Sequence, residues 1–447
     1  MSKKVSHKIQ KAIKIRFVPL KEQENFFNIN FGCARLIYNL NVADRLDYWN
    51  QVKDLPKEQR PKYEKKTPKQ WSETTDKNGK PLSFLRDANQ QALCNSSRNC
   101  DKAFNNFFKS IKKERKGKPV GAPNFKSKND HRDSFSNYML AKNCLDWEHR
   151  LVYVSGCGWV KFCHAEDKKG KWLNWFKTAT PKNMTISSTP SREIWCSILF
   201  EKEEDIITTV NLSSAIGLDF SPEHLYVDSK NNIAPYYVAV KQEYKNKKKE
   251  KKLRRRLARK QKGSKSYGKA KTKLARHEQH IADKRRDYIE KETLRLVQTY
   301  DVIGIEDLNL QGMMKFSHNA KNYLDASWGN FVQKLEWKAQ FNNCVIIKAD
   351  RFYPSSKICN HCGYINKNLK LSDRVWVCPN CGETIIRDSN AGQNLRDNAI
   401  KTIVEGINST LLLEQQNVMS VEGIEVQYIN GILCGVSYET ERLSSNT

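Results

Sequence analysis

The spacing of apolar and polar residues changes along the chain and divides it into segments of different structure. Apolar residues alternate with polar ones over 11–19, which predicts a strand. Apolar residues at helical spacing predict one helix over 21–48 and another over 93–111. The intervening residues 51–82 are rich in lysine, proline and glutamine and have little periodicity. We therefore expect a linker or a loosely ordered loop there.

Short runs of aromatic and β-branched residues follow at 151–154, 159–163 and 194–200, separated by Gly, Ser and Pro. They predict short strands, and together they favour a small β-barrel. The strand at 11–19 could complete this barrel, in which case the helical segment is inserted after the first strand.

From residue 214 onward, the predicted elements come in a characteristic order. We expect three strands, a long basic helical region, a fourth strand, a helix, a fifth strand and a final helix. The strands are expected at 215–220, 224–228, 233–240, 301–308 and 344–350, and the helices at 243–298, 331–341 and 389–404. This order is that of a ribonuclease-H-like fold, so the expected fold class is α+β with several domains.

Three acidic residues stand at the ends of these elements. Asp219 closes the first strand, Glu306 ends the fourth, and Asp388 opens the last helix. Strands one and four are neighbours in such a sheet, so the three carboxylates should meet and repel one another unless a cation joins them. Hard oxygen ligands suit two magnesium or manganese ions, which together support phosphodiester hydrolysis. Asp307 is the alternative to Glu306, but alternation along the strand points it to the other face.

Four cysteines form two Cys-x2-Cys pairs, Cys359 with Cys362 and Cys378 with Cys381, separated by 15 residues. This spacing is typical of a closed tetrahedral zinc site with a structural role. We call residues 351–386, which carry the four cysteines, the ribbon. The other nine of the 13 cysteines are scattered, which indicates thiols in a reducing compartment.

The chain is strongly basic, with 78 Lys and Arg against 49 Asp and Glu and a formal net charge of +29. Such an excess favours a polyanionic partner. The charge is densest over 241–290, which holds 21 basic and 6 acidic residues. We expect two helices there, joined by a loop at 263–268. The alternative to nucleic-acid binding is a solvated charged surface. The expected phosphate-binding residues are Arg254, Arg255, Arg256, Arg259 and Lys260.

Other classes of function find no support in the sequence. No apolar run approaches the roughly 20 residues that span a bilayer, and the first ten residues lack the apolar segment of a signal peptide. We therefore expect no membrane partner and a cytoplasmic location in a prokaryotic cell, in association with the nucleoid. No P-loop is present, which argues against ATP-driven work.

These motifs resemble the TnpB family of transposon-encoded RNA-guided DNA nucleases and its relatives, the compact type V CRISPR effectors. KAIKIRFVPLKEQ and FGCARLIYNL are similar to the start of that family. GLDF, IGIEDL, WGNFVQKLEWKA, FYPSSKICNHCG, VCPNCG and RDSNAGQNL are similar to its C-terminal half, in the same order. The resemblance covers most of the chain. It maps the family's split RuvC triad onto Asp219, Glu306 and Asp388, and its zinc ligands onto the four cysteines.

One position departs from the family's pattern. The family often has a second acid two residues before the last catalytic aspartate, and Ile386 stands there in this chain. Catalysis does not need that acid, so we expect an active nuclease.

The resemblance implies a wedge β-barrel that is interrupted by a helical recognition insert, followed by a RuvC nuclease domain that carries the zinc ribbon. The implied boundaries are 1–20 and 141–210 for the barrel, 21–140 for the insert, 211–350 for the nuclease domain with a basic helical insertion at 241–298, 351–386 for the ribbon, 387–410 for the last helix and 411–447 for a C-terminal tail.

The resemblance also implies the partners. The protein would act as a monomer or homodimer on one structured guide RNA and read a short motif in double-stranded DNA. It would then let the guide pair with the target strand and cleave DNA at the RuvC centre. Two other functions remain open: an RNA-guided DNA-binding repressor that does not cleave, and a guide-independent nuclease or strand transferase. The source of the guide, a transposon end or a CRISPR array, is open as well.

Overall fold

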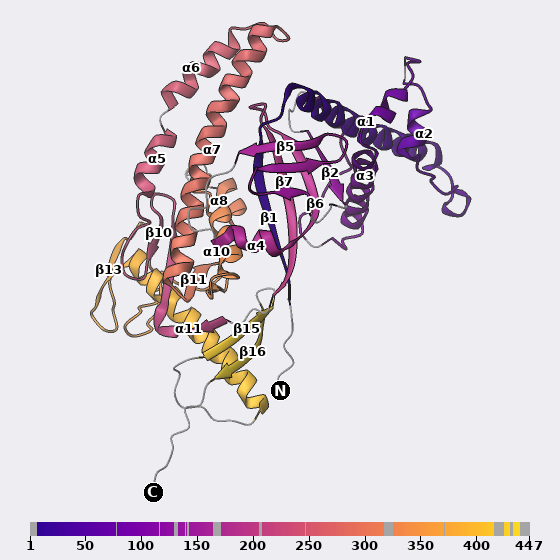
Figure 1. The fold of residues 1–447 in the computed structure, drawn as a ribbon. Coiled ribbons are helices and arrows are strands. Elements are labelled where there is room, and N and C mark those ends of the chain that lie inside the picture. The colour runs from indigo at the N-terminus through magenta and orange to yellow at the C-terminus, as the bar shows by residue number, and fades with distance from the viewer. Residues whose placement is uncertain are drawn as a thin grey trace. The chain divides into compact units, whose positions relative to one another are not determined.

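The computed structural model of the chain contains two units that each have their own hydrophobic core (Figure 1). One unit consists of Lys8–Glu204 with Gly268–Arg276, and the other of the described residues within Asp205–Tyr267 and His277–Thr447. None of the described helices is long and apolar enough to cross a membrane. The structure describes residues 7–76, 78–115, 117–128, 133–138, 140, 143–163, 171–204, 208–245, 247–316, 325–370, 372–414, 424–429 and 432–438.

Short strands of the first unit form a seven-stranded sheet with the order β2-β6-β7-β1-β5-β4-β3. Strand β1 lies between β7 and β5, so the expected contribution of residues 11–19 to this sheet is confirmed. β2 and β3 are its edges in the described part of the chain, so the sheet is a half barrel and not the closed barrel that the sequence suggested. The strands are β1 (His7–Phe17), β2 (Ser134–Tyr138), β3 (Leu145–Asp146), β4 (Leu151–Val154), β5 (Gly158–Cys163), β6 (Thr180–Ser188) and β7 (Ile194–Glu204), and helix α4 (Lys171–Thr178) precedes β6.

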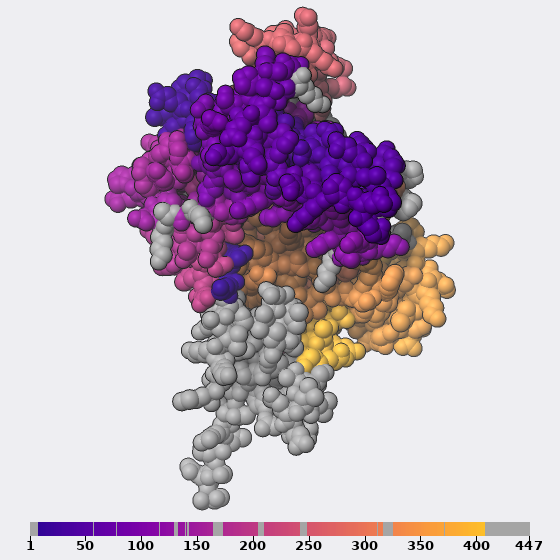
Figure 2. Space-filling view, turned by 90° about the vertical axis from the view of Figure 1, so that its right-hand side faces the viewer, coloured from indigo at the N-terminus to yellow at the C-terminus, as the bar shows by residue number. Residues whose placement is uncertain are grey.

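The helical segment between β1 and β2 packs around two long helices, α1 (Lys21–Val52) and α3 (Gln90–Ile111). The expectation of a linker or loosely ordered loop at 51–82 is wrong in part, because the segment contains short helices and a buried anchor. It contains η1 (Lys57–Gln59) and α2 (Pro68–Ser72), and η2 (Ser83–Asp87) follows it. The indole of Trp71 is buried and donates a hydrogen bond of 3.2 Å to Asn41 of α1. In the space-filling view most of the purple surface, to which these helices contribute, forms one large area (Figure 2).

The second unit is built on a four-stranded sheet with the order β10-β9-β11-β12. β11 is parallel to both of its neighbours, and β10 is antiparallel to β9. Apolar residues of α7 and α10 form a core with alternate residues of β9 and β11 on one face of the sheet. The elements are β9 (Ala215–Ser221), β10 (Leu225–Asp228), α5 (Tyr237–Lys245), α6 (Lys247–Ala258), α7 (Lys265–Thr299), β11 (Val302–Glu306), α8 (Leu310–Phe316), α10 (Trp328–Ala339), β12 (Val345–Ala349) and α11 (Arg387–Glu414).

The expected third strand at 233–240 is wrong. Only Ile233 forms an isolated bridge, to Val227, and the chain then enters helix α5 at Tyr237. Tyr236, immediately before the helix, has a φ of 60°, which interrupts any extended run. A short continuous apolar run fits a strand or a buried helix equally well, which explains the error.

A third sheet joins distant parts of the chain. Strands β15 (Ile424–Ile429) and β16 (Ile432–Tyr438) form an antiparallel pair, and β15 also pairs with β8 (Thr208–Val210). No pattern in the sequence predicted these two strands, and β15 pairs with a strand that lies more than 200 positions earlier in the chain.

Candidate functional site

Alternation along two parallel strands places Asp219 and Glu306 on one face of the four-stranded sheet. Leu218 of β9 lies opposite Ile305 of β11, and both side chains are fully buried in the core with α7 and α10. The next residue of each strand, Asp219 and Glu306, therefore points to the other face. Glu306 is the last residue of β11, and Asp219 lies at the equivalent level of β9, which continues to Ser221, because the two strands are parallel and in register.

Helix α11 (yellow in Figure 1) lies on that second face in direct backbone contact with both strands. A Cβ atom at Gly217 would lie 1.8 Å from the carbonyl oxygen of Gly392, and one at Gly304 would lie 2.2 Å from that of Leu395. Only glycine permits so close an approach of helix and strand. Since Asp388 is one turn before Gly392, this packing brings the first turn of α11 to the ends of β9 and β11.

The three carboxylates act on one another electrostatically. Burial raises the pKa of Asp219 well above its ordinary value, and the negative charges of Glu306 and Asp388 raise it further, against smaller opposing effects of two arginines. Burial also raises the pKa of Glu306, although a hydrogen bond from Ser355 lowers it in part. A cation bound among these groups would relieve both the repulsion and the loss of hydration.

Two arginines face Asp388. Nη1 of Arg374, in the ribbon, lies 3.3 and 3.2 Å from the two carboxylate oxygens, and Nε of Arg387 lies 3.3 Å from Oδ1. Among the described residues, the four ribbon cysteines are the group of three or more potential metal ligands whose donor atoms all lie within 4.8 Å of one another, and the three carboxylates do not meet that limit. The three carboxylates are therefore gathered at one end of the sheet, but they are spaced more widely than a closed coordination shell.

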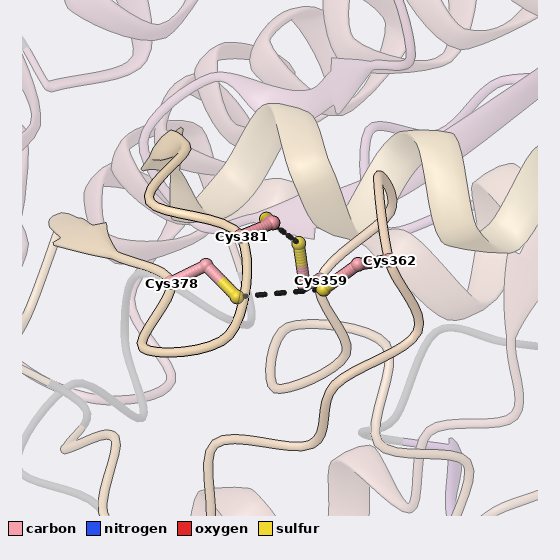
Figure 3. A group of neighbouring side chains, drawn as sticks. All are labelled: Cys359, Cys362, Cys378 and Cys381. Atoms are coloured by element: carbon pink, nitrogen blue, oxygen red, sulfur yellow. Dashed lines mark hydrogen bonds between the residues drawn. The ribbon is translucent and has the colours of Figure 1, made fainter.

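The four ribbon cysteines converge on one point, with their sulfur atoms turned toward one another (Figure 3). The Sγ atoms of Cys359 and Cys381 are 3.7 Å apart, and those of Cys362 and Cys378 are 3.6 Å apart. Zinc–sulfur bonds of about 2.3 Å in a tetrahedron place the sulfurs about 3.8 Å apart. The donor set and its spacing therefore fit a four-coordinate zinc ion, with no position left for water.

Both halves of this site are built by the same local turn. The backbone carbonyl oxygen of Cys359 accepts a hydrogen bond from the N–H of Gly363 (2.8 Å), and that of Cys378 accepts one from the N–H of Gly382 (2.9 Å). Each glycine has a positive φ, 76° and 72°, which an L-residue with a side chain rarely adopts. The sequence Cys-x2-Cys-Gly thus encodes the turn as well as the ligands. Strands β13 (Val375–Val377) and β14 (Thr384–Ile386) and a small core around Trp376 support the second half.

Asp307, the alternative to Glu306, lies immediately after the end of β11 and has a different partner. Its Oδ2 is 2.8 Å from Nη2 of Arg351, and its side chain is 43% exposed. It is not among the groups that shift the pKa of Asp219.

The expected basic region forms two helices, α6 and α7, joined by a loop that contains Gly263 with a φ of 89°. Arg254 does not present its charge freely, because its guanidinium pairs with Glu250 (2.7 Å) and with Glu278 of α7 (2.6 Å). Arg255, Arg256, Arg259 and Lys260 are exposed. Leu253 is buried, so one face of α6 is used for packing and the rest carries charge.

Two sets of site residues were missed by the sequence analysis. The first is the glycine contact of Gly217, Gly304 and Gly392, and a glycine within a strand is itself a signal of close backbone approach. The second is Ser355, whose hydroxyl donates a hydrogen bond of 2.6 Å to Oε1 of Glu306. No pattern in the sequence indicates that hydrogen bond, because it joins residues 49 positions apart.

Three protein-family models match the chain. OrfB_IS605, described as "Probable transposase", matches residues 197–317, which include Asp219 and Glu306. "Cas12f1-like, TNB domain" matches 328–395, which include the four cysteines and Asp388. The "Helix-turn-helix domain" of OrfB_IS605 matches 8–54. The three matches follow one another along the chain at 8–54, 197–317 and 328–395.

Relatives of known name align over long stretches. "Putative RNA-guided DNA endonuclease" of Streptomyces pristinaespiralis is 28% identical over 390 residues, which are 87% of this chain and 89% of that protein. "Putative RNA-guided DNA endonuclease InsQ" of Escherichia coli K12 is 27% identical and covers 71% of this chain and 77% of its own length. A solved "Cas12f1-sgRNA-target DNA complex" aligns with 87% of this chain and 99% of its own, at 13% identity and a TM-score of 0.49. The sequence matches confirm the resemblance of this chain to the TnpB family of RNA-guided DNA nucleases and its type V CRISPR relatives.

Proposed function

We propose that the protein is an RNA-guided DNA endonuclease of the TnpB and compact type V effector type, with a single RuvC centre formed by Asp219, Glu306 and Asp388. The observation that carries this proposal is the convergence of three carboxylates from β9, β11 and α11, which glycine contacts between the helix and the strands enforce. Two relatives that align over most of the chain carry RNA-guided DNA endonuclease in their names.

The carboxylates suit magnesium or manganese because they are hard oxygen donors whose burial and mutual repulsion disfavour the ionised state in the absence of a cation. Two such ions, when bound, would activate a water molecule and stabilise the leaving oxygen of a phosphodiester. In this chain, Asp219 and Glu306 would hold the ions from the sheet, and Asp388 from the helix. Arg374 and Arg387 would limit the negative charge that a phosphate meets on approach.

The ribbon would have a structural role. Four thiolates fill a tetrahedral zinc site, so zinc would stabilise the fold of the ribbon beside the carboxylates and would not activate water.

The partners follow from charge and from the relatives. A net charge of +29 suits a protein that holds both an RNA and a DNA duplex through backbone contacts. The nucleic-acid-binding residues that we propose are those expected from the sequence, Arg254, Arg255, Arg256, Arg259 and Lys260, at the end of α6 and just after it. We further propose a structured guide RNA, recognition of a short motif in double-stranded target DNA, and a monomer or homodimer on each guide, acting in the prokaryotic cytoplasm. The half barrel with its helical insert would bind the guide and the motif, and the second unit would cleave.

A repressor that binds without cutting is the second candidate, and the loss of one acid would mark it. All three acids are present, and the negative charges of Glu306 and Asp388 help to raise the pKa of Asp219. The third candidate is a guide-independent nuclease or strand transferase, which would form a product from bare DNA without any guide RNA.

The experiment begins with RNA that co-purifies with the protein. Sequencing this RNA identifies the guide, and a DNA duplex that matches its variable end is then offered in magnesium. We expect cleavage of the matched duplex and none of an unmatched duplex. Asp219→Ala, Glu306→Ala and Asp388→Ala should each abolish cleavage and keep target binding, because the basic surface is unchanged. Cleavage by any of these variants, or in excess chelator, would refute the assignment, and equal cleavage of both duplexes would favour the guide-independent alternative.

A further inference from the structure

The turn that leads into the first cysteine pair is fastened to helix α11 by buried asparagines. Nδ2 of Asn394 donates to the carbonyl oxygens of Ser355 (2.7 Å) and Ile358 (2.8 Å). Nδ2 of Asn390, one turn earlier in α11, donates to the same carbonyl of Ile358 (2.7 Å). Both asparagines are 4% exposed, so these bonds replace water that the amides cannot reach.

The partners fix the orientation of each amide. Oδ1 of Asn390 accepts from the backbone N–H of Asn360 (3.0 Å), which can only donate, whereas the carbonyls on the other side can only accept. Oδ1 of Asn394 accepts from the side chain of Asn360 (3.2 Å). Asn360 lies between Cys359 and Cys362, so α11 holds both the turn and the cysteine pair that follows it.

The same turn reaches the carboxylates. Ser355 is 3% exposed, and its hydroxyl donates a hydrogen bond of 2.6 Å to Oε1 of Glu306. A hydroxyl that donates to one carboxylate oxygen restricts rotation of that group and leaves the other oxygen free for a cation. Outer partners of this kind orient metal-binding carboxylates, and their removal usually weakens metal binding by about 10- to 100-fold.

We infer that Ser355 is a positioning residue for Glu306, and that Asn390 and Asn394 make its position depend on the folded first cysteine pair. This inference rests on the proposed function, in which Glu306 binds a divalent cation. It assigns the ribbon a second role, since an intact zinc site would then hold one of the carboxylates in the orientation that a cation needs.

The first test is Ser355→Ala, with Ser356→Ala as the matched control. Ser356 is the next residue of the same turn, is only partly buried, and makes no side-chain hydrogen bond to any described residue. Binding of Mn²⁺ to the full-length protein is measured by electron paramagnetic resonance, with Asp219→Ala as the blank, and zinc content is measured on the same preparations. The magnesium concentration for half-maximal cleavage is a second readout.

We expect Ser355→Ala to keep its zinc and to weaken Mn²⁺ binding at least about tenfold, with a matching rise in the half-activating magnesium concentration. Ser356→Ala should behave like the wild type, and Ser355→Thr, which keeps the hydroxyl, should restore most of the affinity. Wild-type Mn²⁺ affinity in Ser355→Ala would overturn the inference. Loss of zinc in Ser355→Ala would also overturn it, because Ser355 would then only support the turn.

Asn394→Ala tests the connection to the ribbon. We expect it to keep the four thiolates and zinc but to weaken Mn²⁺ binding as Ser355→Ala does, since the turn loses two of its attachments to α11. Unchanged Mn²⁺ affinity in this variant would restrict the role to Ser355 alone and refute the connection. Failure of the proposed function gives a different result, because Asp219→Ala would then bind Mn²⁺ as the wild type does.

Discussion

A single methyl group at Gly304 should impair cleavage without unfolding the protein. The Cβ of Gly304→Ala would lie 2.2 Å from the carbonyl oxygen of Leu395 and 3.2 Å from the Cβ of Ala399. To restore an ordinary contact of 3.4 Å, β11 and α11 must separate by about 1.2 Å. Neither partner can yield by a side-chain rotation, because the closest atom belongs to the backbone.

The shift acts directly on the site. Asp388 lies seven residues before Leu395 in the same helix, so a rigid displacement of α11 moves its carboxylate by about 1 Å relative to Glu306. Misplacement of a catalytic group by about 1 Å can reduce the rate about 100-fold, whereas one extra methyl in a packed region usually costs only about 1–3 kcal/mol of stability. We therefore expect a folded protein with a cleavage rate at least about 100-fold lower.

The assay is single-turnover cleavage of a matched target at saturating protein–RNA complex, with target binding, zinc content and thermal unfolding on the same preparation. Gly329→Ala is the control, because its new Cβ would meet only Leu310 Cδ1 at 3.7 Å. Gly217→Ala should be more severe than Gly304→Ala, since its Cβ would lie 1.8 Å from a carbonyl oxygen. A folded Gly304→Ala protein that cuts at the wild-type rate would refute the idea that this contact positions Asp388.

Three further predictions concern other parts of the chain. Replacement of Arg255 and Arg256 by alanine should weaken nucleic-acid binding and reduce the log–log salt slope by about 0.9 for each lost contact to a duplex phosphate; an unchanged slope would mean a solvated surface. Cys378→Ser should release zinc and sharply reduce cleavage but leave guide-RNA affinity nearly unchanged, as zinc analysis and filter binding would show; a parallel loss of RNA affinity would contradict this. Burial acts to raise the pKa of Glu290, but hydrogen bonds from two lysines outweigh burial and lower it. The ionised carboxylate of Glu290 therefore stabilises the fold above its unfolded pKa of about 4.3, and this stabilisation is lost as the pH falls through the lower folded pKa. Glu290→Gln, which leaves the buried Lys338 without its carboxylate, should therefore lower the melting temperature at pH 7 and have little effect near pH 3; an equal decrease at both values would rule out the ion pair as the cause.

The parts of the site that could be predicted from the sequence are those with local signals. The Cys-x2-Cys-Gly repeats encode both the ligands and the turns, and the sulfur atoms meet as expected. Asp219 and Glu306 could be placed because each follows a run of buried strand residues, where alternation decides the face. In both cases, a few neighbouring residues determine the local geometry.

The features that could not be predicted from the sequence depend on contacts between residues that are distant in sequence. The segment 51–82 has no period because Trp71 and Leu82 anchor it one at a time against α1 and α3, and not along a stripe. The run 233–240 was assigned to a strand because its apolar residues are continuous, and the left-handed Tyr236 that breaks it leaves no mark in the sequence. The ion pairs of Arg254 with two glutamates likewise could not be inferred from charge density.

Helix α11 explains why carboxylates and cysteines from separate segments come together. At about 100° per residue, Asp388, Gly392, Leu395 and Ala399 form one stripe, and Asn390, Asn394 and Asp397 form another on nearly the opposite side. The first stripe contacts the sheet through glycines, and the second binds the ribbon through amide and carboxylate hydrogen bonds. Leu395 and Ala399 of the first stripe are buried, and Ala399 packs with apolar residues of the sheet. The helix is therefore held by close backbone approach and apolar packing on one side and by buried polar contacts on the other, which tolerate little displacement. A shift of α11 toward or away from either neighbour should therefore disturb the position of Asp388 and the support of Glu306 together.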